Sequence, residues 1–433
     1  MNAPRAALSI PRLARPPELT WRVPGSKSIT NRALVLAALA EGESRLTGVL
    51  HSDDTAHMRA SLEALGVSIR DDGPATLVVL GGRSRLRAPD RPLFIGNSGT
   101  SVRFLAALAA LVDGVVRFEG DEAMARRPIQ DLVDGLRQLG VKVDCPTGCP
   151  PLTVHGGRLS GGVVTMAGGR SSQYFSALLL SGGLADGEIE VRVEGRLVSR
   201  PYVEITRRMV ADFGGMIDER DGGFVVRHAS GYRARTYAVE PDASSASYPF
   251  ALAAATGGAI TVPDLGLGAL QGDYRFVDVL EAAGAEVTRS AGATTVRGRG
   301  PLRGIDVDMH DISDTVMTLA AIAPLSTGTT RITNVANIRI KETDRLAAVV
   351  AELERLGQGI TQGDDYLVVT PRPLRPASVR TYGDHRMAMS FAVLGAAAGA
   401  VTVEDPGCVA KTYPGFWDDL SSCYRSIGAP NPF

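Results

Sequence analysis

The sequence has few cysteines and no clustered set of them, which excludes a disulfide-stapled protein. Its 433 residues contain four cysteines, and only Cys145 and Cys149 lie close together. A disulfide framework needs more cysteines at closer spacing, and a structural zinc site needs four ligands where this C-x3-C pair offers two. We therefore expect reduced thiols, no metal site and a cytoplasmic protein.

Long apolar runs, a signal peptide and a strong net charge are also missing. Runs such as 33–40 and 391–403 are shorter than the ~18 residues that cross a bilayer, so no membrane association is expected. The first 17 residues contain arginines and prolines without an apolar core, which predicts a mobile tail. The 46 basic and 47 acidic residues nearly cancel, so the composition does not demand a nucleic-acid surface.

What is present predicts a folded protein of more than one domain. Hydrophobic residues make up 44% of the chain, which excludes a disordered chain. A length of 433 residues exceeds one ordinary core and favours two or three domains. The 49 glycines indicate many tight turns and close backbone approaches.

A sixfold repeat organises almost the whole chain. Six times, an alanine-rich apolar run ends at a glycine, and successive glycines are 70 to 73 residues apart. These glycines are Gly42, Gly114, Gly187, Gly257, Gly328 and Gly399. After each comes a strand-like stretch, at 44–49, 115–119, 189–193, 259–262, 330–335 and 401–404. A helical pattern then closes near a second glycine, at Gly66, Gly140, Gly214, Gly284, Gly357 and Gly428. The repeat predicts six βαβαββ modules with helices inside and sheets outside.

Six modules in a chain of this length suggest two lobes of three. Pro24 and Pro241 mark the two crossings, which gives one lobe of 25–240 and another of 1–24 plus 241–433. The strand expected at 19–23 precedes the first helix and is predicted to close the second lobe. A small-molecule site is expected between two such lobes.

The start of the apolar helix in each module carries the candidate chemistry. Fifteen residues before each of the first glycines stand Lys27, Gly99, Ser172, Asp242, Ser313 and Asp384, each in a polar or glycine-rich segment. Serine and aspartate there are expected as ordinary N-caps. That explanation fails for Lys27, Arg32, Arg103 and Arg386, because cations are disfavoured at the positive end of a helix dipole. Basic side chains at helix N-termini favour a bound anion.

Nine segments resemble the 5-enolpyruvylshikimate-3-phosphate synthase family and occur in its order. They are PGSKSITNRALVLAALAEG (24–42), GNSGTSVR (96–103), RRPIQDL (126–132), SSQYFSALL (171–179), SRPYVEIT (199–206), ISDTVMTLA (312–320), NIRIKETDRL (337–346), DHRMAMSFA (384–392) and AKTYPGF (410–416). The resemblance covers about 19–428. It implies the α/β enolpyruvyl transferase fold, a two-domain inverse α/β barrel with three modules in each domain, in agreement with the repeat.

The resemblance also implies a reaction and its site. The 5-hydroxyl of shikimate 3-phosphate attacks C2 of phosphoenolpyruvate, and phosphate leaves from a tetrahedral ketal, in the shikimate pathway to chorismate and the aromatic amino acids. No cofactor is implied, and a monomer inhibited by glyphosate at the phosphoenolpyruvate position is expected. By match to the family motifs, shikimate 3-phosphate is bound by Lys27, Ser28, Arg32, Ser171, Ser172, Gln173, Ser199, Tyr202, Asp314, Asn337 and Lys341. Phosphoenolpyruvate is bound by Lys27, Asn97, Gly99, Arg127, Gln173, Arg345, Arg386 and Lys411.

Acid–base chemistry needs two groups with different tasks. Asp314, expected at a helix start, is the candidate to take the proton of the 5-hydroxyl. Glu342 is the candidate to protonate C3 of phosphoenolpyruvate and later to remove a proton there, with Lys27 and Lys341 as further catalytic candidates. The acidic pair Asp53-Asp54 is interpreted as a solvated loop.

Two other interpretations stay open. The sister enolpyruvyl transferase that acts on UDP-N-acetylglucosamine shares the fold, but it usually carries a reactive cysteine in the loop that reads GDEAMARRPIQ (120–130) here. A non-catalytic anion-binding scaffold is the alternative of another class, and the presence of Asp314, Lys341 and Glu342 together speaks against it.

Overall fold

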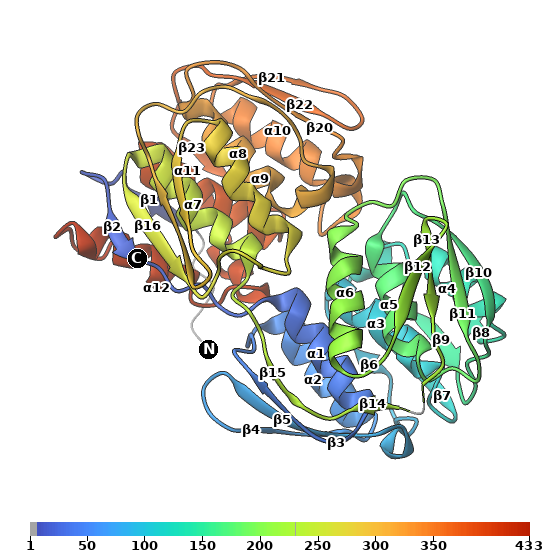
Figure 1. The fold of residues 1–433 in the computed structure, drawn as a ribbon. Helices are drawn as coiled ribbons and strands as arrows, with labels where there is room; N and C mark the ends of the chain where they lie inside the picture. The colour runs from blue at the N-terminus through green and yellow to red at the C-terminus, as the bar shows by residue number, and fades with distance from the viewer. Residues whose placement is uncertain (1–6, 230) are drawn as a thin grey trace. The chain divides into compact units, whose positions relative to one another are not determined.

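The computed structural model describes residues 7–229 and 231–433. The chain divides into two compact units, each with its own core (Figure 1). We call 25–240 the N-terminal unit, and 7–24 together with 241–433 the C-terminal unit. The divisions fall between Pro24 and Gly25 and between Glu240 and Pro241.

The N-terminal unit contains three small sheets, each carried by one module. Its helices are α1 (Lys27–Leu39), α2 (Asp53–Ala64), α3 (Gly99–Ala109), α4 (Gln130–Gln138), α5 (Ser172–Gly182) and α6 (Pro201–Asp212), with short 3-10 turns η1 (Arg83–Arg85) and η2 (Met124–Arg126). Its strands are β3 (Ala40–Thr47), β4 (Ser68–Asp71), β5 (Thr76–Gly81), β6 (Leu93–Phe94), β7 (Val115–Glu119), β8 (Lys142–Asp144), β9 (Leu152–His155), β10 (Gly162–Ala167), β11 (Ile189–Glu194), β12 (Ile217–Arg220), β13 (Gly223–Val226), β14 (Tyr232–Arg233) and β15 (Thr236–Ala238). The sheet orders are β6-β7-β9-β8, β10-β11-β13-β12 and β14-β3-β5-β4, with β15 also paired to β3.

The C-terminal unit repeats this arrangement. Its helices are α7 (Ala243–Thr256), α8 (Phe276–Ala282), α9 (Val316–Ile322), α10 (Arg345–Arg355), α11 (His385–Ala398) and α12 (Phe416–Ser426), with 3-10 turns η3 (Gly272–Arg275), η4 (His310–Thr315), η5 (Ala323–Leu325), η6 (Ala336–Ile340) and η7 (Pro406–Lys411). Its strands are β1 (Ala7–Ile10), β2 (Glu18–Thr20), β16 (Ala259–Pro263), β17 (Glu286–Arg289), β18 (Ala293–Arg297), β19 (Asp306–Asp308), β20 (Thr330–Thr333), β21 (Gly359–Gln362), β22 (Leu367–Thr370), β23 (Ala377–Val379) and β24 (Val401–Glu404). The sheet orders are β17-β18-β16-β2, β19-β20-β22-β21 and β1-β24-β23.

The strand pairing confirms six modules among the described residues. In each module the first strand pairs in parallel with the second, as β10 does with β11 and β19 with β20. The connection between two such strands passes through an apolar helix, which is the usual way to join parallel strands. Two modules take their first strand from elsewhere in the chain: β14 and β15 serve β3, and β2 serves β16. The closing strand predicted at 19–23 is therefore present as β2, although it ends at Thr20.

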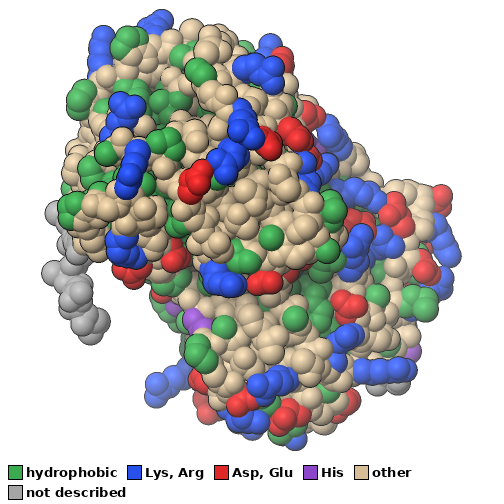
Figure 2. Space-filling view, turned by 60° about the vertical axis from the view of Figure 1, so that its left-hand side comes forward, with side chains coloured by type: hydrophobic (Ala, Val, Ile, Leu, Met, Phe, Trp, Pro, Cys, Tyr) green, Lys and Arg blue, Asp and Glu red, His purple; other side chains and the backbone are tan. Residues whose placement is uncertain are grey.

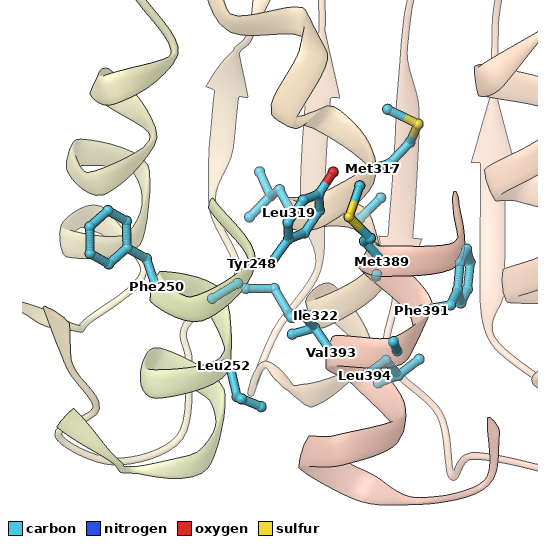
Figure 3. Close-up of a cluster of buried hydrophobic side chains, with 14 of the residues drawn as sticks. Tyr248, Phe250, Leu252, Met317, Leu319, Ile322, Met389, Phe391, Val393 and Leu394 are labelled. Carbon is cyan, nitrogen blue, oxygen red and sulfur yellow. The ribbon is translucent and has the colours of Figure 1, made fainter. Parts of the chain in front are cut away.

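The core of each unit is a group of three helices. Helices α1, α3 and α5 contact one another in the N-terminal unit, and α7, α9 and α11 do so in the C-terminal unit. Eleven residues of α1 and all eleven of α3 are buried, as expected for helices rich in Ala, Leu and Val on every face. Figure 3 shows part of the second core, with Tyr248 from α7, Leu319 from α9 and Met389 from α11.

The outer helices are amphipathic and end where the sequence predicts. In α10, Leu346, Val349, Val350 and Leu353 are buried on one face. The glycine that follows each outer helix has a positive φ, between 74° and 104° at Gly66, Gly140, Gly214, Gly284, Gly357 and Gly428. A residue with a Cβ is disfavoured in this conformation, so glycine ends the helix there.

Two predictions for the fold are wrong. Of the tail predicted to be mobile, residues 1–6 lie outside the described part, but Ala7–Ile10 form β1 and pair antiparallel with β24. Leu8 and Ile10 alternate with exposed residues and are buried, so one face of this strand packs against the core of the C-terminal unit. The fifth central helix starts late, because the 3-10 turn η4 contains the non-helical Ile312 and α9 begins only at Val316.

The surface is consistent with the balanced charge. Lys and Arg side chains and Asp and Glu side chains are both scattered over the face drawn in Figure 2, without a continuous basic area. Among the residues that the structure describes, no helix has both the length and the apolar composition to cross a membrane.

Candidate active site

The N-termini of the three central helices of the N-terminal unit lie at one end of its core. Ser26 caps α1 and accepts a hydrogen bond from Ile29 N at 3.4 Å, and Ser171 caps α5 and accepts from Gln173 N at 3.3 Å. The N-terminal parts of the helices meet: Arg32 of α1 lies over the ring of Phe104 in α3 and donates to Ser176 of α5, and Gln173 in the first turn of α5 donates to Thr100 in the first turn of α3 at 3.3 Å. This end therefore combines several positive helix termini, which favours an anion.

Lys27 is the first residue of α1 and points toward a buried carboxylate. Its Nζ lies 3.3 Å from Asp54 Oδ2, and both side chains are largely buried. The interpretation of Asp53-Asp54 as a loop is wrong, because both residues lie in the first turn of α2. Asp53 is exposed, as expected for a solvated residue, but Asp54 is 2% exposed. Asp54 is thus a site neighbour that the sequence reading missed.

Arg32 connects three helices below the N-termini. It is 1% exposed, and it donates to Thr206 Oγ1 at 2.8 Å, Ser28 O at 2.9 Å, Ser176 Oγ at 3.0 Å and Tyr202 O at 3.0 Å. Burial lowers the pKa of Arg32 to about 10. Each guanidinium nitrogen already has a protein acceptor, so the geometry supports a role for Arg32 in holding Ser28 and Tyr202 in place.

Arg127 and Gly99 lie against each other at the start of α3. Arg127 Nη1 donates to Asn97 O at 2.9 Å and to Asn97 Oδ1 at 3.0 Å, and the side chain is buried. A Cβ added at Gly99 would lie 2.5 Å from Arg127 Nη2. Gly99 thus leaves room for the guanidinium directly beside a helix N-terminus.

The remaining predicted residues of the N-terminal unit surround α5 and α6. Ser171 and Gln173 are partly exposed and Ser172 is buried, in the first turn of α5. Ser199 precedes α6 with φ 49°, a conformation uncommon for serine, and Tyr202 lies in the first turn of α6. Gln173 accepts a hydrogen bond from Arg103 at 2.5 Å, so Arg103 adjoins the predicted site.

In the C-terminal unit, Arg345 brings together the two predicted acid–base residues. It is 1% exposed, and it reaches Glu342 Oε2 at 2.7 Å, Asp384 Oδ2 at 2.7 Å and Asp314 Oδ1 at 3.0 Å. Burial alone would lower the pKa of Arg345, but the carboxylates of Asp384, Glu342 and Asp314 outweigh burial and raise it. Arg345 stays charged and acts as the centre of this cluster.

Two further predicted cations border Asp314. Arg386 Nη2 lies 2.9 Å from Asp314 Oδ2, and Lys341 Nζ lies 3.8 Å from Asp314 Oδ1. Asp314 lies in η4 rather than at the start of α9, for which Thr315 is the N-cap. The side chain of Asp314 is therefore used for ion pairs instead of capping.

Asn337 and Lys411 complete the set of the C-terminal unit. Asn337, in η6, donates to Ser313 Oγ at 2.9 Å. Lys411 is buried at the end of η7, which packs against α11. Asp384, which the sequence predicts as an N-cap, caps α11 and also binds Arg345. No local sequence pattern predicts this second role, because Arg345 is 39 residues away in the chain.

Comparisons with known proteins agree with this architecture. The family model of EPSP synthase (3-phosphoshikimate 1-carboxyvinyltransferase) matches residues 18–420. A 3-phosphoshikimate 1-carboxyvinyltransferase of Trichormus variabilis is 43% identical over 425 residues, covering 97% of this chain and 99% of that protein. A chloroplastic 3-phosphoshikimate 1-carboxyvinyltransferase of Petunia hybrida is 43% identical over 423 residues, covering 93% of this chain and 82% of that protein.

Solved structures support the fold. An EPSP synthase from Acinetobacter baumannii superposes with a TM-score of 0.82 at 25% identity, covering 96% of this chain and 98% of that one. The enolpyruvyl transferase NikO from Streptomyces tendae superposes with a TM-score of 0.75 at 21% identity, covering 96% and 97%, and supports the fold alone. The predicted enolpyruvyl transferase fold is confirmed. The chain belongs to the EPSP synthase (3-phosphoshikimate 1-carboxyvinyltransferase) family.

Proposed function

We propose that the side chains at the helix N-termini of the two units hold the substrates and move the protons of the reaction that defines this family. The chain transfers the enolpyruvyl group of phosphoenolpyruvate to the 5-hydroxyl of shikimate 3-phosphate and releases phosphate, a step of aromatic amino acid biosynthesis. The two substrates together carry two phosphates and two carboxylates, so they need several cations and N–H donors.

The N-terminal unit supplies most of the contacts to shikimate 3-phosphate. Its phosphate is proposed to bind the hydroxyls and backbone N–H groups at the start of α5, where Ser171 and Ser172 stand, and Lys27 and Ser28 offer further donors. The other proposed contacts of this unit are Gln173, Ser199 and Tyr202. Arg32 donates a hydrogen bond to Tyr202 O and so helps to hold Tyr202 in place. The C-terminal unit contributes Asp314, Asn337 and Lys341 to the same substrate.

Phosphoenolpyruvate is proposed to bind cations from both units. In the N-terminal unit these are Lys27 and Arg127, with Asn97, Gly99 and Gln173 as neighbours, and in the C-terminal unit they are Arg345, Arg386 and Lys411. An arginine fork binds a carboxylate or a phosphate with two parallel hydrogen bonds, which suits this substrate. The hydrogen bonds from Arg127 to Asn97 fix the orientation of its guanidinium.

The acid–base steps are assigned to Asp314 and Glu342. The carboxylate of Asp314 takes the proton of the attacking 5-hydroxyl, while Glu342 gives a proton to C3 of phosphoenolpyruvate and the tetrahedral ketal forms. Glu342 then removes a proton from C3 as phosphate leaves, which restores the double bond and the protonated Glu342. The proton that Asp314 took is passed to the departing phosphate, which returns Asp314 to its carboxylate form. The observation that carries this assignment is that one buried guanidinium, Arg345, holds the carboxyl groups of Asp314 and Glu342 beside each other, at 3.0 and 2.7 Å. Lys27 and Lys341 are proposed to stabilise charge during these steps.

Phosphate release from phosphoenolpyruvate tests the proposal. Purified protein is expected to release phosphate with shikimate 3-phosphate as acceptor and not with UDP-N-acetylglucosamine, and release with the second acceptor alone would favour the sister transferase. Asp314→Asn is expected to abolish turnover. Its matched control is Asp311→Asn, which lies in the same 3-10 turn but forms an exposed ion pair with Arg275. Equal activity of the two variants would exclude Asp314 as the base.

Inhibitor binding, assembly and compartment are further proposals. Glyphosate is proposed to occupy the phosphoenolpyruvate position beside Gly99, and competition with phosphoenolpyruvate would support this. The protein is proposed to act as a monomer, which size-exclusion chromatography with light scattering would test. All four cysteines are free, as expected in the reducing cytoplasm that we propose as its compartment.

A further inference from the structure

Arg103 lies one turn into α3, beside the site but outside the set of residues assigned to substrate. It is 5% exposed, and its guanidinium lies 5.2 Å from the ring centroid of Tyr174. It donates from Nη1 to Gln173 Oε1 at 2.5 Å and from Nη2 to Pro128 O at 3.1 Å. A buried cation held against an aromatic ring and two neutral acceptors has one defined position.

The contact with Arg103 decides which end of the Gln173 amide faces outward. A guanidinium has five N–H donors and no acceptor, so the atom of Gln173 that faces it must be the carbonyl oxygen. The NH2 group then lies on the other side, where it donates to Thr100 Oγ1 at 3.3 Å. An amide nitrogen carries two hydrogens, and Thr100 takes one of them.

Thr100 alone could not fix this orientation. A hydroxyl can donate or accept, so Thr100 would bind either end of the amide equally well. The terminal torsion of glutamine is broad and roughly two-fold, so a flipped amide fits the same space. A flipped amide would present its oxygen to a bound anion and repel it.

We propose that Arg103 is a positioning residue, which holds the Gln173 amide with its NH2 group toward the bound substrate anion. The inference rests on the proposed function, in which Gln173 contacts both substrates. Arg103 has a second effect on the site, because its bond to Pro128 O restrains the carbonyl of the residue next to Arg127. Tyr174 donates to the same carbonyl at 2.7 Å, so Pro128 O keeps one donor when Arg103 is replaced. The orientation of the Gln173 amide depends on Arg103.

A double-mutant cycle tests the inference. Arg103→Met removes every donor at similar length, and the KM for phosphoenolpyruvate is expected to rise roughly tenfold with little change in kcat, the factor for losing about one hydrogen bond to a charged group. In the Gln173→Ala background the same substitution is expected to change KM by no more than about twofold, because the amide is gone. An equal rise in both backgrounds would overturn the inference. If Gln173→Ala itself leaves both KM values unchanged, the assignment of Gln173 to substrate fails and the role of Arg103 fails with it.

Two other variants separate positioning from structure. Tyr174→Phe removes the other donor to Pro128 O and leaves the Gln173 contact intact, so KM is expected to stay within about twofold while thermal stability falls. If Arg103→Met does not fold, Arg103→Lys repeats the cycle, since its ammonium can face Gln173 Oε1 but cannot reach both acceptors as a fork. Arg103→Lys is expected to keep KM within about threefold. A tenfold rise in KM for Arg103→Lys, with Gln173 present or replaced by alanine, would contradict the proposal.

Discussion

Replacing Gly99 by alanine tests whether the space beside Arg127 controls binding at the phosphoenolpyruvate position. The new Cβ would lie 2.5 Å from Arg127 Nη2 and 2.8 Å from Cζ, while ordinary contact begins at 3.4 Å. The guanidinium must therefore move by roughly an ångström, because the backbone of α3 is fixed by its packing in the core. Such a shift weakens the two hydrogen bonds that Arg127 donates to Asn97 at 2.9 and 3.0 Å.

The expected loss of affinity for phosphoenolpyruvate follows from the weakening of these two hydrogen bonds. A hydrogen bond to a charged group contributes about 1.5–3 kcal/mol, and ~1.4 kcal/mol corresponds to tenfold in affinity. Gly99→Ala is therefore expected to raise the KM for phosphoenolpyruvate roughly tenfold. Glyphosate is longer than phosphoenolpyruvate and is expected to lose more, so its inhibition constant should rise by a larger factor.

Steady-state kinetics with glyphosate as a competitor measures both factors. Gly292→Ala is the matched control, because a Cβ at Gly292 meets nothing within 4 Å and its backbone is not in the left-handed region. The control is expected to keep both constants. Equal losses for glyphosate and phosphoenolpyruvate would refute the steric explanation, and no loss for either would refute the role of Arg127.

The other predictions concern the C-terminal unit. Glu342→Gln is expected to retain shikimate 3-phosphate binding by calorimetry while turnover falls by roughly 10²–10⁴, and lost binding would contradict its assignment to proton transfer. Asp384→Leu removes a fully buried partner of Arg345 and is expected to lower the free energy of unfolding by about 3–5 kcal/mol in urea, whereas Asp278→Ala, at an exposed ion pair, should cost less than about 1 kcal/mol. Burial raises the pKa of Asp419, so its carboxyl group binds a proton more tightly in the folded state than in the unfolded state. The contribution of Asp419 to stability is therefore greatest at acid pH and is lost as pH rises through the folded pKa. The stability of Asp419→Asn relative to the natural protein should therefore rise between pH 4 and pH 7, and a flat or falling difference would exclude this linkage.

The repeat and the helix ends follow from short-range sequence pattern. Apolar runs rich in Ala, Leu and Val indicate helices buried on all sides, and the structure places α1, α3 and α5 and α7, α9 and α11 in the two cores. Glycines such as Gly66 and Gly357 indicate helix ends, because a positive φ there is unfavourable for residues with a Cβ. The six modules and most strand positions were predictable for this reason, and nine motifs in order indicated the family.

Other features depended on contacts between residues far apart in the chain. The tail was predicted to be mobile, yet Ala7–Ile10 pair with β24 almost 400 residues later, and a four-residue segment carries no signal strong enough to predict such a partner. Asp54 was interpreted as solvated because acidic pairs usually are, but α2 places it against Lys27.

The sequence by itself determined the modules, the helices and the kinds of side chain at their N-termini, because periodicity, glycine and capping act over a few residues. Tertiary structure alone decided which charges neutralise one another. Arg345 could have pointed toward solvent, and packing instead surrounds it with Asp314, Glu342 and Asp384, since a guanidinium that is 1% exposed must be compensated by neighbouring carboxylates. The same holds for Arg103, whose partner Gln173 lies on another helix and is brought within 2.5 Å by the packing of α3 against α5.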